Sequence, residues 1–391
     1  MTLDSLPSSG LPQGIHSRFV EGVNGLRMHV LEAGEPGRPM LLLLHGFPEL
    51  AYSWRKVMTP LAGLGYYVVA PDQRGYGRTT GWDADFDGDL FSFRKLNLVR
   101  DALALVNALG YREVEAVIGH DFGSTVAGWA AVVRPDVFRR AVMMSASFSG
   151  APSLPGPLPL APSPLAERGD REIAPTAAYD IHAAMRELPR PRKHYQMYYS
   201  TRPANEDMWR APQGLHDFLR AYYHHKSADW AGNKPFRLNA WTAEDVAQMP
   251  TYYIMDLNRT MPETVAEEMP SAAEIAACRW LTEAELAVYA AEYERNGFQG
   301  GLNWYRCGTS GIDAAELVLY SGQTLDVPSC FIAGASDWGT YQRPGSMEAM
   351  RDRACTDFRG VHLVEGAGHW VQQEQPEETV RLLTAFLEDS L

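Results

Sequence analysis

The chain is poor in cysteine, and its 391 residues include only four: Cys278, Cys307, Cys330 and Cys355. None of them forms a CxxC pair or another spacing typical of zinc ligands, so the sequence predicts no disulfide framework and no cysteine-based metal site. Reduced thiols are typical of cytoplasmic proteins, and we therefore expect a cytoplasmic location.

Long apolar runs and basic clusters are absent as well. No segment is apolar over a length that would cross a bilayer, and residues 1–14 have neither the basic start nor the apolar run of a signal peptide. The net charge is −13 and lysine and arginine are scattered, so we expect neither a nucleic-acid partner nor a membrane partner. The sequence leaves the assembly open, with a homodimer as one option.

Short apolar segments alternate with helical patterns near both ends of the chain. Apolar segments of this kind predict strands at 40–44, 66–70, 114–118, 141–146, 329–333 and 361–364. A hairpin is expected over 17–32, helical spacing of leucine and valine predicts a helix over 93–109, and a last helix begins near 376. The pattern is that of a mostly parallel, twisted α/β sheet flanked by helices.

The alternation stops in the middle of the chain. Residues 150–164 are rich in proline and predict an ordered linker, and residues 174–309 are helix-like with many aromatics. Thr282 and Glu285 have the spacing of a capping box, which predicts a helix that runs on to Gly297. We therefore expect an N-terminal core part at 1–149, a helical insertion at 150–310 and a C-terminal core part at 311–391.

Asp121 stands between a predicted strand and a predicted helix, in the sequence Gly119-His120-Asp121-Phe122-Gly123. The two glycines have the spacing of a nucleophile elbow, a sharp turn that exposes the central side chain. Most elbows carry serine, which suits acyl transfer. A carboxylate instead attacks an electrophilic carbon and leaves an ester on the enzyme, so the sequence favours epoxides or alkyl halides as substrates.

Two further side chains follow predicted strands of the same sheet. Asp337 comes after the strand at 329–333, and His369 comes directly after the strand at 361–364. The order nucleophile, acid, histidine resembles that of the α/β-hydrolases. We expect His369 to activate water as a general base and Asp337 to orient its imidazole. A packing histidine and a turn aspartate are the alternatives.

Two loops at the ends of early strands are predicted to support this site. The loop His45-Gly46-Phe47-Pro48 can aim a backbone N–H at the elbow, and we expect the N–H groups of Phe47 and Phe122 to form an oxyanion hole. The loop at 71–78 has a structural role in this interpretation, in which Asp72 and Arg74 hold it together by charge-assisted hydrogen bonds.

With the motifs HGFPE, DxRGYG, GHDFG, SDWG and GAGHW in this order, the chain resembles the epoxide hydrolases of the α/β-hydrolase superfamily. The resemblance covers roughly residues 15–150 and 310–391. It implies an α/β-hydrolase fold in which the insertion is a helical cap. It also implies hydrolysis of a small hydrophobic epoxide to a vicinal diol through an ester on Asp121, without a cofactor or a metal.

In this family the cap supplies two tyrosines that bind and protonate the epoxide oxygen. The string NWYR resembles the second tyrosine motif and nominates Tyr305, whereas HYQMYY resembles the first and nominates Tyr195. Tyr198 and Tyr199 are close enough in sequence to be alternatives to Tyr195. The stretch at 201–277 is longer than the usual cap, and its paired histidines are expected to pack or to be solvated rather than to bind metal.

The nearest alternative function is a haloalkane or haloacetate dehalogenase, which also uses an aspartate nucleophile. Such enzymes bind halide or substrate carboxylate with side-chain donors, typically at the variable position of HGxP and just after the nucleophile. Both positions are phenylalanine here, Phe47 and Phe122, so the sequence favours an epoxide. An ester hydrolase would need a serine nucleophile, and a catalytically silent binding protein would commonly lack a member of the triad.

Overall fold

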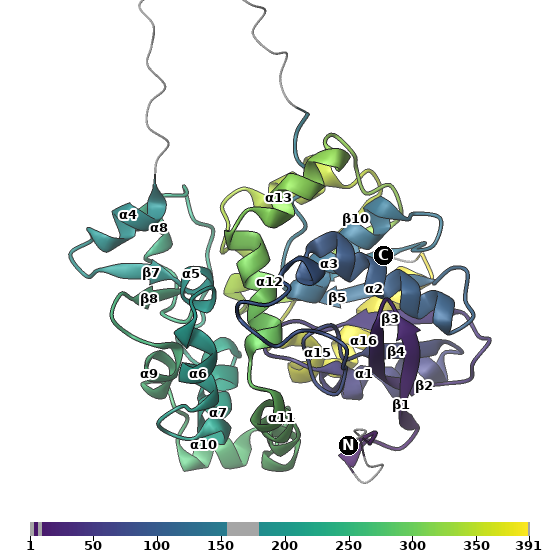
Figure 1. The fold of residues 1–391 in the computed structure, drawn as a ribbon, viewed down its shortest axis with the longest axis horizontal. Helices are drawn as coiled ribbons and strands as arrows, with labels where there is room; N and C mark the ends of the chain where they lie inside the picture. The colour runs from purple at the N-terminus through teal and green to yellow at the C-terminus, as the bar shows by residue number, and fades with distance from the viewer. Residues whose placement is uncertain (1–3, 7–9, 155–179, 390–391) are drawn as a thin grey trace, which may run out of the picture.

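The computed structural model describes residues 4–6, 10–154 and 180–389, and Figure 1 shows their arrangement. Of the linker predicted at 150–164, residues 155–164 lie outside the described residues. The described part has one central sheet, helices packed against it, and a group of helices beside it. None of the helices in this part is both long and apolar enough to span a bilayer.

The central sheet has eight strands in the order β1-β2-β4-β3-β5-β6-β9-β10. β1 and β2 form the predicted antiparallel hairpin, β2 runs antiparallel to β4, and all other neighbouring pairs are parallel. The strands are β1 (Ile15–Val23), β2 (Leu26–Ala33), β3 (Met40–Leu44), β4 (Tyr67–Pro71), β5 (Ala116–His120), β6 (Ala141–Met144), β9 (Ser329–Gly334) and β10 (Phe358–Val364). The predicted mostly parallel α/β sheet is thus confirmed.

The central strands are buried along their whole length, because helices pack against the sheet. α1 packs with α16, and α2 packs with α3. The helices of this layer are α1 (Arg55–Gly63), α2 (Lys95–Ala108), α3 (Phe122–Val133), α13 (Ile312–Leu317), α14 (Ser346–Ala349), α15 (Val371–Glu374) and α16 (Pro376–Leu387). Since the parallel strands all end at one edge, the loops that follow β3, β5, β9 and β10 meet there.

The inserted segment is largely helical, as predicted, and in Figure 1 most of it lies to the left of the sheet. Its helices are α4 (Ile181–Arg186), α5 (Tyr195–Tyr199), α6 (Pro203–Trp209), α7 (Leu215–Lys226), α8 (Ala243–Val246), α9 (Met261–Ala266), α10 (Ala272–Ala277), α11 (Glu283–Asn296) and α12 (Gln299–Thr309). The capping box at Thr282 begins α11, and α11 ends before Gly297, as expected. The boundaries at 149/150 and 310/311 remain a prediction.

One part of the insertion differs from the prediction. β7 (Arg192–His194) and β8 (Ile254–Asp256) pair as a small antiparallel sheet, although the sequence indicated only helix here. Strands of three residues are too short to show an alternating pattern. Their partners are also far apart along the chain, so local sequence carries no signal for the pairing.

Asp72 and Arg74 form charge-assisted hydrogen bonds, but only Asp72 holds its own loop. Asp72 pairs with His29 on β2 at 2.7 Å and accepts the backbone N–H of Arg78 at 2.9 Å. Arg74 instead binds both carboxylate oxygens of Asp101 on α2, at 2.7 and 2.8 Å. The predicted role of Arg74 is wrong in this respect, because Arg74 anchors the loop to α2, and no local pattern points to that helix.

Candidate active site

Asp121 lies at a sharp turn between β5 and α3, with φ of 52° and ψ of −117°. A Cβ atom at Gly119 would overlap the carbonyl oxygen of Gly123, and one at Gly123 would overlap that of Leu44. Only glycine therefore fits at these two positions. The strained backbone of Asp121 is held by this close packing, as in a nucleophile elbow, and its carboxylate stands at the carboxyl edge of the sheet.

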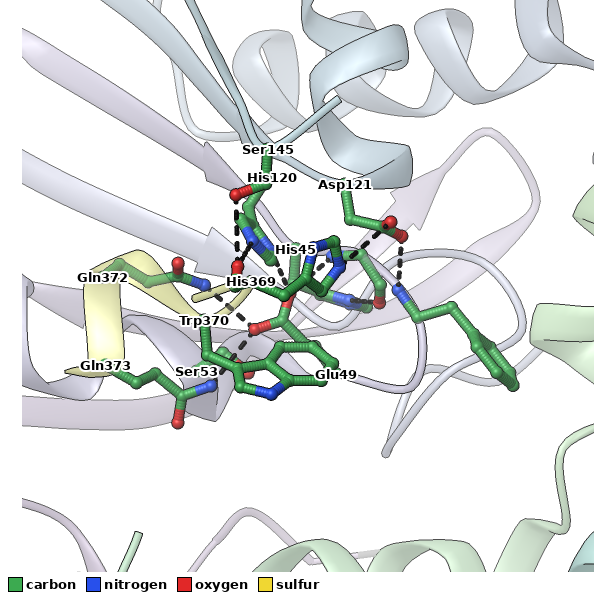
Figure 2. Close-up of polar contacts among 12 residues, drawn as sticks. His45, Glu49, Ser53, His120, Asp121, Ser145, His369, Trp370, Gln372 and Gln373 are labelled. Carbon is green, nitrogen blue, oxygen red and sulfur yellow. Dashed lines mark hydrogen bonds and ion pairs between the residues drawn. The ribbon is translucent and has the colours of Figure 1, made fainter. Parts of the chain in front are cut away.

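His369 lies between the two aspartates that the sequence singled out. Its Nε2 is 3.3 Å from Oδ2 of Asp121, and its Nδ1 is 3.1 Å from Oδ1 of Asp337. Figure 2 shows the imidazole pointing toward Asp121. Asp337 also accepts the N–H of Gly339 at 2.7 Å, which fixes its carboxylate. The structure therefore brings Asp121, His369 and Asp337 together in the geometry of a nucleophile, a base and an orienting acid.

Of the two predicted oxyanion donors, the N–H of Phe47 donates a hydrogen bond to Oδ1 of Asp121 at 3.1 Å. Phe122 is the first residue of α3, directly after Asp121, so its N–H belongs to the free amino end of that helix. Both phenylalanine rings pack edge-on against the ring of Tyr305, at 5.4 and 4.5 Å between centroids.

Tyr195 on α5 and Tyr305 on α12 line the same cavity as Asp121, which has a volume of about 490 Å³. The centroids of the two rings are 5.7 Å apart. Tyr198 donates its hydroxyl hydrogen bond to Asp207, and Tyr199 donates to Tyr222, so these two phenols are engaged elsewhere. Of the tyrosines that the sequence left open, Tyr195 is the one among the residues that line this cavity.

The protonation states of these groups complement one another. Burial raises the pKa of Asp121, but the hydrogen bond and charge of His369 outweigh it and hold the pKa well below its usual value. Burial, together with the negative charge of Asp121, raises the pKa of both Tyr195 and Tyr305. The cavity therefore contains a carboxylate anion and two neutral phenols, which can donate hydrogen bonds.

Comparison with known proteins agrees with this geometry. The family model described as alpha/beta hydrolase fold matches residues 39–376. The chain is 33% identical to epoxide hydrolase B of Mycobacterium tuberculosis (strain H37Rv) over 372 residues, which cover 93% of this chain and 96% of the relative. It is 30% identical to an epoxide hydrolase of Caballeronia sordidicola over 93% of this chain and 91% of the relative.

Solved structures give the same result. An epoxide hydrolase from an endophytic Streptomyces superposes with a TM-score of 0.74 and 29% identity, covering 96% of each chain. Epoxide hydrolase I from potato (Solanum tuberosum) has a TM-score of 0.70 and 29% identity, covering 96% of this chain and 99% of its own. The chain belongs to the epoxide hydrolases of the α/β-hydrolase superfamily.

Lys226, at the end of α7, is a charged group of this epoxide hydrolase that the sequence did not point to. Its side chain is buried, and its Nζ lies 5.0 to 5.8 Å from the ring centroids of Tyr222, Tyr252, Tyr253 and Trp370. Burial lowers the pKa of Lys226 below its usual value, and the charges of Asp121, Asp337 and Glu49 offset only part of this effect. The charge of Lys226 helps to lower the pKa of Asp121. The sequence does not indicate this contact, because a lysine at the end of a helix is usually solvated.

Glu49, the last residue of the HGFPE motif, forms a second buried charge network in this epoxide hydrolase (Figure 2). It accepts a hydrogen bond from His120 at 2.5 Å, from the N–H of Gly46 at 3.0 Å and from Gln372 at 2.9 Å. The other ring nitrogen of His120 contacts the carbonyl oxygen of His369 at 2.6 Å. The network therefore contacts both the loop that carries Phe47, through Gly46, and the backbone of His369.

The main chain of α12 touches the main chain of the DQRGYG loop. A Cβ atom at Gly75 would overlap the backbone of Gly300, and a Cβ atom at Gly300 would overlap that of Gly75. One turn further along α12, the indole N–H of Trp304 donates to the carbonyl oxygen of Arg74 at 3.0 Å. The helix that carries Tyr305 is therefore held in direct contact with the core of the epoxide hydrolase.

Proposed function

We propose that this protein hydrolyses a small hydrophobic epoxide to a vicinal diol in two steps, through an ester on Asp121. The observation that carries the proposal is the single cavity in which the ionised Asp121 faces the neutral phenols of Tyr195 and Tyr305. One part of the lining is aromatic and includes Phe122 and Trp304, which supports a substrate with a hydrophobic portion, while polar side chains such as Gln196 line the rest.

In the first step, Oδ2 of Asp121 attacks an oxirane carbon, since Oδ1 is held by the N–H of Phe47. The carbon–oxygen bond of the ring breaks, and its electron pair stays on the oxirane oxygen. Tyr195 and Tyr305 bind this oxygen, and one phenol gives it a proton. The products are a hydroxyalkyl ester of Asp121 and a tyrosinate, and the two phenols also orient the ring for attack.

In the second step, His369 removes a proton from water, and the resulting hydroxide attacks Cγ of the Asp121 ester. The N–H groups of Phe47 and Phe122 stabilise the tetrahedral oxyanion, and Asp337 stabilises the imidazolium. Cleavage of the bond between Cγ and Oδ2 leaves the diol as an alkoxide and Asp121 as a protonated carboxyl. His369 gives its proton to the alkoxide, and the proton on Asp121 returns to the tyrosinate, which restores the resting enzyme. The sum is one epoxide plus one water to one diol.

The route can be tested by one turnover in ¹⁸O-labelled water with enzyme in excess. Because water attacks Cγ, the label should appear in Asp121, and the diol formed in that turnover should be unlabelled. The mass of the peptide that contains Asp121 gives the measurement. Label in the diol and not in Asp121 would mean direct attack of water on the epoxide and would rule out the ester.

The phenols should matter for the first step. Tyr305→Phe and Tyr195→Phe should each slow ester formation by about 100-fold, since each removes one donor from the departing oxygen. Stopped-flow measurement of ester formation gives the rate. Tyr198→Phe is the matched control, because its hydroxyl is bonded to Asp207, and it should leave this rate within about twofold. Equal losses in all three variants would contradict the assigned roles.

A dehalogenase remains the rival function, and the same site distinguishes the two. The side chains of Phe47 and Phe122 offer no N–H to a halide, whereas the two phenols suit an alkoxide. Release of halide from haloalkanes or haloacetates, without diol from epoxides, would favour the rival.

We further propose a cytoplasmic location, which is supported by the four cysteines being free thiols.

A further inference from the structure

Three consecutive backbone N–H groups around the catalytic histidine all have defined acceptors. The N–H of Gly368 donates to Oε2 of Glu374 at 2.9 Å, and the N–H of Trp370 donates to Oε1 of the same carboxylate at 2.9 Å. The N–H of His369 itself donates to the carbonyl oxygen of Lys226 at 2.9 Å. The backbone N–H groups of the two residues next to His369 are therefore held by one side chain.

The same carboxylate also reaches the insertion. Oε2 of Glu374 accepts the N–H of Ala228, in the segment that follows α7, at 2.8 Å. The backbone there is packed so closely against Gly368 that a Cβ atom at this glycine would overlap Ser227 and Ala228. Glu374 thus joins the histidine loop, which belongs to the core, to the insertion that carries the two phenols.

A carboxylate is well suited to this task, because it accepts several hydrogen bonds at once and binds N–H groups more strongly as an anion. Burial raises the pKa of Glu374 to about 8, whereas the three N–H groups lower it. The charge of Asp229 also raises this pKa. A cavity of about 380 Å³ is lined by Glu374 together with the titratable side chains Arg220, His224, Asp229, Glu274 and Arg279.

We propose that Glu374 is a positioning residue, which fixes the main chain at His369 so that its imidazole reaches the water that cleaves the Asp121 ester. Asp337 orients the ring about its own axis, but it does not hold the peptide groups on either side. A misplacement of about 1 Å can cost about 100-fold in rate, so the anchoring of this loop matters for the base. This inference rests on the proposed ester mechanism.

The proposal separates the two half-reactions. Ester formation uses Asp121 and the phenols and does not need His369 as a base, whereas ester cleavage does. If Glu374 only stabilised the fold, its loss would lower the amount of active protein and leave the ratio of the two rates unchanged. If it positions His369, its loss should slow cleavage selectively.

The experiment compares Glu374→Gln with the wild type at pH 9, where the wild-type carboxyl is ionised. Glutamine keeps the size but turns an NH₂ group toward an N–H donor, so at least one of the three hydrogen bonds is lost. We expect ester cleavage to slow about tenfold while ester formation changes less than about twofold. Intact-protein mass should then show the ester as the main steady-state species. Glu377→Gln, an exposed glutamate on α16, is the matched control and should behave as wild type.

Unchanged cleavage, or an equal loss in both rates, would overturn the proposal. Should Glu374→Gln not fold, Glu374→Asp keeps the charge on a shorter side chain and is read by the same ratio of rates. The outcome for the mechanism is separate. If no ester forms in the wild type, in Glu374→Gln or in a variant at His369, the proposed function is wrong. If the ester forms in Glu374→Gln and is cleaved at the wild-type rate, only the proposed role of Glu374 is wrong.

Discussion

Replacing Asp121 by alanine should reduce epoxide turnover by about 10⁴-fold or more, because the variant has no atom that can form the ester. Water is a poor substitute even though both phenols remain, because it is a weaker nucleophile than a carboxylate and is not held in line with the oxirane carbon. Diol formation from a panel of aliphatic and aryl epoxides, followed by chromatography, gives the measurement. Every substrate should be affected alike, since the loss concerns the nucleophile and not the walls of the cavity.

The control for this prediction is an aspartate outside the site. Asp136 is exposed and pairs with Arg134, and Asp136→Ala should keep full activity. Circular dichroism must show that Asp121→Ala is folded. Aspartate and alanine both carry a Cβ atom, so the strained backbone at position 121 is a similar cost for both and does not predict that the variant unfolds. Diol formation at more than about a tenth of the wild-type rate by the folded variant would disprove a nucleophilic Asp121.

Replacing His369 by glutamine should stop the reaction halfway and trap the ester. Glutamine has a similar reach but takes up no proton at neutral pH, so water is not activated while Asp121 still attacks the epoxide. Intact-protein mass after incubation with excess substrate should increase by the mass of one epoxide. The rate of diol release should fall by about 10³-fold or more.

His16→Gln is the matched control, because His16 is exposed on β1, and it should show neither the mass increase nor a loss of turnover. The trapped ester should also be absent from the double variant that lacks Asp121. A His369→Gln protein that stays unmodified under saturating exposure to an epoxide that the wild type hydrolyses would count against the two-step route.

The sequence predicted those parts of the fold and site that depend on local patterns. Wholly apolar segments predicted the central strands, and Gly119 and Gly123 predicted the turn that presents Asp121. Asp337 and His369 could be nominated because each follows a strand, and parallel strands end at one edge of a sheet. Once the order of the strands is known, these side chains must lie near one another.

Residues that act across the boundary between insertion and core could not be predicted in this way. The carbonyl oxygen of Lys226 accepts the N–H of His369, and Glu374 holds the neighbouring Gly368, although no local pattern points to either contact. The same holds within the core, where Arg74 binds Asp101 rather than its own loop. The choice among the tyrosines at 195, 198 and 199 likewise depends on how α5 packs. Hydrogen-bond partners distant in the chain are set by tertiary packing, which a single sequence does not display.

The contact between Gly75 and Gly300 fixes the distance between the core, which carries Asp121, and α12, which carries Tyr305. In the proposed reaction, the carbon that Asp121 attacks and the oxygen that a phenol protonates belong to one small ring, whereas Asp121 and Tyr305 come from different parts of the chain. The backbone of the loop at Gly75 touches the backbone of α12 at Gly300, with no side chain between them. A change of rotamer or of side-chain packing therefore cannot bring the loop and the helix closer together. Substrate range should then vary through the cavity walls, while the reach from acid to nucleophile stays constant.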